Sequence, residues 1–156
     1  MIVGDSGLLM AYINDYDGPV QTVDYGDMDL YDLSFQDLGG DAGIYWYLVG
    51  AGGSLIYGDG EGNVDYLETG VNETLRSVYS ASVNFAMAVG DNDTAIITQD
   101  GGASFDITTY KTGEDVDLLS LEFYENNNRA YVAGSDGYFA MVFGGDEVII
   151  PAPPEY

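Results

Sequence analysis

The sequence predicts an all-β protein built as an array of about four four-stranded sheets, the first of them incomplete. Three observations lead to this prediction. A glycine-centred turn recurs four times, short apolar segments alternate with turn residues, and no segment shows the sustained 3.6-residue apolar period of a helix. The chain has 156 residues, of which 46% are hydrophobic, so it can bury a core of its own. We therefore expect a single domain over residues 1–156.

The recurring turn begins with a glycine that follows a small apolar residue. The four glycines are Gly4, Gly50, Gly90 and Gly134. Each precedes a short polar stretch of Gly, Asp, Asn or Ser, residues that tolerate positive φ and suit tight hairpins. Because an apolar run follows each turn, we expect the turn to join two strands in every unit.

The rest of the repeat can be aligned around these turns. Segments 30–35, 75–80 and 118–123 match one another and are expected to form the first strand of their units. The repeat units are then about 1–26, 30–70, 75–113 and 118–153. The first unit begins in its second strand, so either segment 147–151 closes a ring or the ring stays open. An open ring leaves bare sheet edges, which symmetric assembly with other chains would cover.

Two of the predicted second strands are apolar on both faces, at 44–49 and 85–89. A strand with one wet face would alternate apolar and polar residues, so these strands need cover on both sides. Small sheets stacked face to face around an axis provide that cover. Four-stranded units of about 40–50 residues have the spacing of β-propeller blades. A β-sandwich of hairpins is the alternative.

One hairpin carries a more specific pattern. Thr98, Asp100, Gly102, Ser104 and Phe105 resemble the Asp-box, Ser/Thr-x-Asp-x-Gly-x-Thr/Ser-aromatic. This motif marks the BNR group of β-propellers, which includes sialidases, sortilin-like domains and photosystem II assembly factors. The resemblance implies a propeller with the motif on the hairpin between the third and fourth strands of a blade. An Asp-box is a mark of the fold: its carboxylate can accept N–H bonds of the turn, and it is not a catalytic group.

The residue inventory argues against catalysis. The chain has no His and no Cys, which removes the usual general bases, nucleophile pairs and zinc ligands. Sialidase-like propellers hold their substrate with an arginine cluster, whereas Arg76 and Arg129 occupy different positions of this repeat. Segments 91–93 and 15–17 offer oxygen atoms for calcium, but ordinary turn chemistry explains them more simply. We predict no catalytic residue, no metal site and no cofactor.

Charge is the most unusual property of the sequence. Lys and Arg number 3 against 27 Asp and Glu, which gives a net charge of −24. Such a charge destabilises a compact chain in dilute buffer, and molar salt screens it. Adaptation to high salt is therefore the preferred interpretation, with a calcium-rich setting or a basic partner as the rival. So few cations argue against binding to nucleic acid and against insertion into an anionic membrane.

These observations favour three functions in order. The first is a structural or interaction module of a salt-adapted assembly, with a haloarchaeal virion component (capsid surface, turret or tail) as the specific case. The second is an intracellular assembly factor of the BNR type or a ligand-binding propeller, and the third is a glycoside hydrolase. The expected partners are other protein chains, as a homo-oligomer or a larger assembly. A virion or an extracellular location is preferred, and the cytoplasm is the alternative.

Overall fold

The computed structural model describes residues 2–6, 8–11, 21–24, 26–37, 43–59, 63–104, 106–109, 116–124, 129–143 and 147–149. Strands and turns make up this part of the chain, with two short 3-10 turns, η2 (Ala51–Gly53) and η4 (Ser135–Gly137). The described segments hold no α-helix, and hence none long and apolar enough to cross a bilayer. The predicted all-β class is confirmed.

The strands of the described residues form four antiparallel sheets, here named A to D in chain order. Sheet A contains β1 (Ile2–Val3), β2 (Leu8–Ala11) and β3 (Gln21–Asp24). Sheet B contains β4 (Leu30–Asp37), β5 (Ile44–Gly50), β6 (Leu55–Gly58) and β7 (Val64–Leu67). Sheet C contains β8 (Leu75–Ser80), β9 (Ala86–Gly90), β10 (Thr94–Thr98) and β11 (Asp106–Thr109). Sheet D contains β12 (Leu118–Tyr124), β13 (Arg129–Gly134), β14 (Phe139–Phe143) and β15 (Glu147–Ile149).

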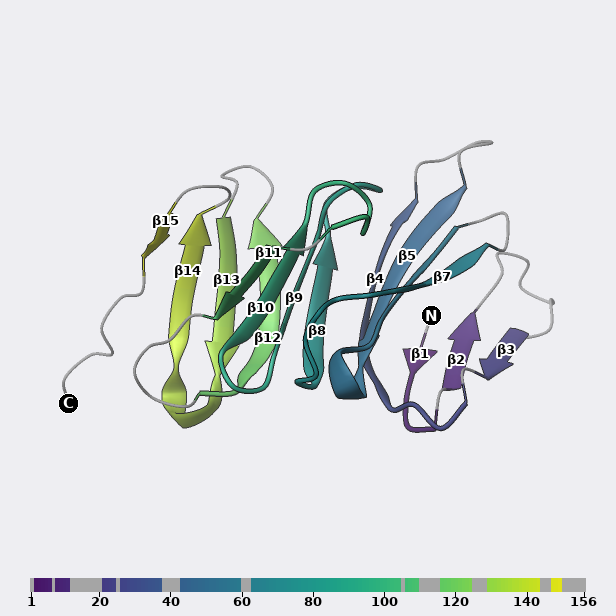
Figure 1. The fold of residues 1–156 in the computed structure, drawn as a ribbon, viewed down its shortest axis with the longest axis horizontal. Coiled ribbons are helices and arrows are strands. Elements are labelled where there is room, and N and C mark those ends of the chain that lie inside the picture. The colour runs from purple at the N-terminus through teal and green to yellow at the C-terminus, as the bar shows by residue number, and fades with distance from the viewer. Residues whose placement is uncertain are drawn as a thin grey trace.

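Each sheet is a simple meander in which consecutive strands are neighbours. Figure 1 shows the four sheets standing in a row in chain order, with sheets A and D at opposite ends. Strand β15 pairs with β14, placing Ile149 opposite Met141. The described part of segment 147–151 therefore belongs to sheet D and lies at the far end of the row from sheet A.

The core lies between the faces of adjacent sheets. Between sheets B and C it contains Tyr47 and Val49 from one side and Ala88 and Ile96 from the other. A second cluster fills the space between sheets C and D, and a third covers the opposite face of sheet B. This explains why β5 and β9 lack polar alternation: consecutive residues of each strand enter different cores.

The sheets meet most closely at their first strands, where β8 lies between β4 and β12. Each first strand is the edge of its sheet, so one side of its backbone has no strand partner. Polar side chains of the preceding sheet take up these N–H groups. Val78 N donates to Asp32 Oδ2 at 3.0 Å, and Leu121 N donates to Ser77 Oγ at 3.2 Å. The hydroxyl of Ser77 itself donates to the same Asp32 oxygen at 2.7 Å, which links three first strands in one chain of contacts.

Candidate interaction face

The four repeat glycines lie at one edge of the array, at the bottom in Figure 1, where the second strand of each unit turns back. The residues with positive φ lie after these glycines, as Asn92 and Asp136 do. This backbone conformation explains why the turns contain Asn, Asp and Gly. Gly90 is needed for another reason. A Cβ atom there would lie 2.0 Å from the carbonyl oxygen of Thr74, and one at Gly50 would lie 2.2 Å from that of Asp29. These glycines allow two backbone segments to touch.

Close approach permits a hydrogen bond that repeats in three sheets. The residue after each glycine donates its N–H to the carbonyl of the residue before the first strand of the same sheet. The pairs are Ala51 N with Asp29 O at 2.9 Å, Asp91 N with Thr74 O at 2.9 Å, and Ser135 N with Asp117 O at 2.8 Å. The turn edge is therefore a fixed surface with a repeating backbone geometry.

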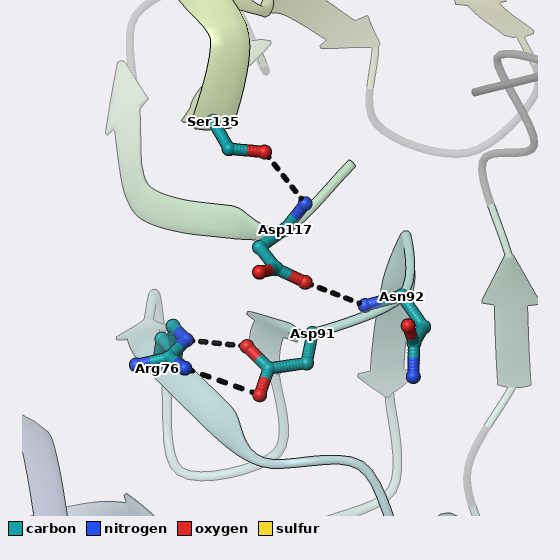
Figure 2. Close-up of polar contacts among 5 residues, drawn as sticks. All are labelled: Arg76, Asp91, Asn92, Asp117 and Ser135. Carbon is teal, nitrogen blue, oxygen red and sulfur yellow. Dashed lines mark hydrogen bonds and ion pairs between the residues drawn. The ribbon is translucent and has the colours of Figure 1, made fainter. Parts of the chain in front are cut away.

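Side chains at this edge also join one sheet to the next. Asp29 Oδ1 accepts the N–H of Ser6 from sheet A at 3.0 Å. Asp117 Oδ1 accepts that of Asn92 from sheet C at 3.2 Å. Figure 2 shows the second link, in which Asp117 N in turn donates to Ser135 Oγ at 3.1 Å. Two aspartates at the same position of the repeat thus hold the turn of the preceding sheet.

Arg76 contributes a cation to this edge. Its guanidinium pairs with both carboxylate oxygens of Asp91, with Nη2 at 3.1 Å from Oδ2 (Figure 2). This hydrogen bond raises the pKa of Arg76 above its ordinary value, so the side chain stays charged. The guanidinium carbon also lies 5.7 Å from the centre of the Tyr31 ring, within the range of a cation–π contact. Both long side chains are therefore held in place before any partner binds.

Tyr31, Arg76 and Leu119 are equivalent residues of the three complete sheets. Each follows a buried leucine and lies where the pairing of the first and second strands shifts register, as in a β-bulge. Tyr31 is 43% exposed and Leu119 is 47% exposed, while Arg76 is half-buried. The array thus presents an aromatic, a cationic and an aliphatic side chain from consecutive sheets at one edge. We name this set the bulge row.

The Asp-box residues lie at the opposite edge, in the hairpin between β10 and β11. Asp100 Oδ1 accepts hydrogen bonds from Thr98 Oγ1 at 2.8 Å and Ser104 N at 3.0 Å, and Oδ2 accepts one from Ser104 Oγ at 2.6 Å. Gly102 has a φ of 91° and donates its N–H to Thr98 Oγ1 at 2.8 Å. Phe105 lies outside the described residues. Every one of these contacts closes the hairpin on itself, which is the pattern of a structural turn.

Hydrogen bonds from Ser104, first from its hydroxyl and then from its N–H, lower the pKa of Asp100 to about 2. Because this value lies below the ordinary 3.8, the ionised carboxylate stabilises the hairpin above pH 3.8, and this contribution is lost as the pH falls towards 2. We expect Ser104→Ala to move the titration of Asp100 back towards 3.8, as followed by NMR of the carboxyl carbon. Ser120→Ala, outside the hairpin, should leave it unchanged. An unaltered titration in Ser104→Ala would contradict this assignment.

A related hairpin lies in sheet B, where segment 59–62 carries only a degraded version of the Asp-box. Asp59 Oδ1 accepts the N–H of Asn63 at 2.9 Å, and Asp59 Oδ2 accepts its side-chain amide at 2.7 Å. The spacing of four residues is that of Asp100 and Ser104. The signal available in the sequence was an Asp followed after three residues by a short polar side chain, without the glycine and aromatic of the full motif.

Across the segments that the structure describes, no group of three or more acidic side chains is arranged to hold a metal ion. In the candidate calcium segment 91–93, the Asp91 carboxylate is engaged by Arg76. The other candidate, 15–17, lies outside the described residues. An open cavity of about 360 Å³ lies beside η2, β7 and the segment after β7, and its lining includes Ser54, Tyr66, Glu68 and Thr69. It holds no constellation of catalytic groups.

Comparison with known proteins bears on the fold. No family model matches the chain, and no curated protein matches its sequence. Among solved structures, YCF48 bound to D1 peptide is similar, with a TM-score of 0.67 and 15% identity over 97% of this chain. YCF48 from Cyanidioschyzon merolae has a TM-score of 0.69 and 14% identity over 88% of this chain. Both are β-propellers, so the chain has a propeller-type fold. It covers 49% and 45% of those chains, about half of their length.

Proposed function

We propose that this chain is a non-catalytic, protein-binding β-propeller module that holds a segment of a partner chain, in the manner of an assembly factor. The observation that carries the proposal is the likeness to YCF48 bound to D1 peptide, a propeller of the same fold with a peptide partner. We take the whole chain as one domain with the four repeat units predicted from the sequence. In this proposal sheet A is an incomplete blade.

The bulge row is the proposed contact surface. Tyr31 offers an exposed aromatic ring, and Arg76 is already oriented by Asp91, so little conformational entropy is lost when a partner packs against them. Tyrosine and arginine are also the side chains most often responsible for binding energy at protein interfaces. A segment that places an apolar side chain on the Tyr31 ring and a carbonyl or carboxylate near Arg76 would fit this surface.

The likeness favours the interaction propeller over the virion component that the sequence first suggested. Nothing in the comparisons supports a capsid, turret or tail role, and salt adaptation stays a prediction from the net charge of −24. The structural neighbours lend no support to a glycoside hydrolase either.

A peptide array in molar KCl tests the proposed function. We expect a subset of peptides to bind, and Tyr31→Ser to weaken the best of them by about tenfold in fluorescence anisotropy, the scale of a lost aromatic anchor. The matched control is Tyr66→Ser. Tyr66 is 59% exposed on β7 of the same sheet but lies outside the bulge row. Absence of any bound peptide, or equal loss in both variants, would contradict the proposal.

A further inference from the structure

The ion pair between Arg76 and Asp91 determines which charge the bulge row offers to a partner. The guanidinium engages both carboxylate oxygens of Asp91, and its Nη2 lies 3.1 Å from Oδ2. Bidentate pairs of this kind are among the strongest contacts of an arginine, so Asp91 already occupies the place that a partner's carboxylate would take. Because a guanidinium carries five N–H groups, Arg76 keeps donors for a further acceptor such as a backbone carbonyl.

A second carboxylate lies near the same guanidinium. The hydrogen bond to Asp91 is the main cause of the raised pKa of Arg76, burial opposes it, and the charges of Asp91 and Asp117 raise the pKa further. Figure 2 shows Asp117 just before β12, where its Oδ1 accepts the N–H of Asn92 from the turn that follows Asp91. Two negative charges therefore lie around one positive charge in the middle of the bulge row.

The ends of the bulge row are acidic as well. Asp29 precedes Tyr31 by two residues and Asp117 precedes Leu119 by two, so an aspartate accompanies each exposed apolar side chain. Both aspartates use Oδ1 to accept an N–H from the turn of the preceding sheet. Within the part of the chain that the structure describes, neither Oδ2 accepts a hydrogen bond. Each of these oxygens can accept a hydrogen bond from a donor of the partner.

We propose that the bulge row selects a partner segment in which Lys or Arg flanks the apolar side chains, and that it rejects a segment that brings a carboxylate to Arg76. This selectivity rests on the proposed function, because it names the chemistry of the segment held at the same surface. Basic side chains of the segment pair with Asp29 and Asp117, and a backbone carbonyl accepts the remaining N–H groups of Arg76. A lone surface arginine would favour an acidic partner, whereas the aspartates around Arg76 reverse that preference, since like charges placed together disfavour binding.

The selectivity is a local property and does not follow from the net charge of −24. A charge spread over the whole chain attracts a basic segment to any surface, and molar salt screens such attraction beyond about 3 Å. Partly buried pairs are screened much less. The side chains of Arg76 and Asp91 are 34% and 24% exposed, so their effect persists in molar KCl, where that of distant carboxylates is lost.

Matched peptides in molar KCl test the selectivity. The best binder from the array is made in three versions that keep its apolar side chains and carry Lys, Gln or Glu at the flanking positions. In fluorescence anisotropy we expect the Lys version to bind at least tenfold more tightly than the Glu version, with the Gln version between them, the scale of a close charge contact. Equal affinities or a preference for Glu would overturn this selectivity. Either result would leave the proposed function standing, because Tyr31→Ser tests that function separately with the uncharged Gln version.

Two isosteric substitutions locate the preference at the bulge row. Asp117→Asn removes a charge but keeps an oxygen for the N–H of Asn92, and it should lower the Lys-to-Glu affinity ratio by about threefold, the scale of an exposed ion pair. Asp91→Asn should release Arg76 and tighten the Glu version by about tenfold. Glu122→Gln is the matched control, because it removes one charge from an exposed position of β12 outside the bulge row and should change neither value. An equal effect of Glu122→Gln and Asp117→Asn on the ratio, or no tightening in Asp91→Asn, would overturn the proposal.

Discussion

Gly90→Ala is expected to lower the free energy of unfolding by about 3 kcal/mol, the upper part of the range for forcing an extra carbon into a packed site. The added Cβ would lie 2.0 Å from the carbonyl oxygen of Thr74 and 2.9 Å from the Cα of Leu75. Both are backbone atoms, so no rotamer change relieves the clash. Relief requires β8 to move away from the turn, which breaks the hydrogen bond from Asp91 N to Thr74 O.

Thermal unfolding in molar KCl, followed by circular dichroism, measures the effect. For a chain of this size, about 3 kcal/mol corresponds to a fall in Tm of about 10 °C. Gly4→Ala is the matched control, because Gly4 holds the same place in the repeat yet has no atom within 4 Å of an added Cβ. Similar Tm values for the two variants would mean that close backbone approach is not the reason for the repeated glycine.

Raising the KCl concentration is expected to stabilise the protein by several kcal/mol. With a net charge of −24 on 156 residues, repulsion between carboxylates favours the unfolded chain. Salt at about 0.1 M screens beyond about 10 Å, whereas about 1 M screens beyond about 3 Å and removes most of this repulsion. We expect Tm to rise by about 10 °C or more across that range, on the same size scaling.

A variant with fewer negative charges distinguishes charge screening from other effects of salt on stability. Asp27, Asp65, Glu68 and Glu122 are exposed, and replacing them with the matching amides removes four negative charges. This variant should be more stable than the wild type at low salt and should gain less from added KCl. A wild-type Tm that is flat between low and molar salt would remove the high-salt interpretation, whatever the variant does.

The fold could be predicted from the sequence because the same local features recur in each unit. Gly50, Gly90 and Gly134 each mark a close backbone contact of their sheet, and the first strands can be aligned through Leu30, Leu75 and Leu118. These leucines are 2% exposed or less: Leu75 and Leu118 enter cores between sheets, and Leu30 enters the cluster on the other face of sheet B. A repeat with a buried residue in every copy is visible without any knowledge of the partner sheet.

Much less of the candidate site could be predicted from the sequence, because its residues differ in chemistry. Tyr31, Arg76 and Leu119 occupy equivalent positions in space but differ in chemistry. Aligning the repeats therefore does not reveal that these positions belong to one site. The carboxylate of Asp117 and the N–H of Asn92 meet across 25 residues of sequence, and Asp32 meets Ser77 across 45. Such pairs follow from how sheets stack, which a single sequence does not specify.

The hydrogen bonds from first-strand amides to side chains of the preceding sheet affect how cooperatively the sheets unfold. The amides of Val78 and Ser80 are satisfied by Asp32 and Ser34 of the preceding sheet. If sheet B melted, sheet C would keep its own strands but lose the acceptors for its inner amides. Sheets B and C therefore protect the edge strand of the sheet that follows them. A truncation that removes sheet B would leave the edge of sheet C open to strand exchange with neighbouring molecules.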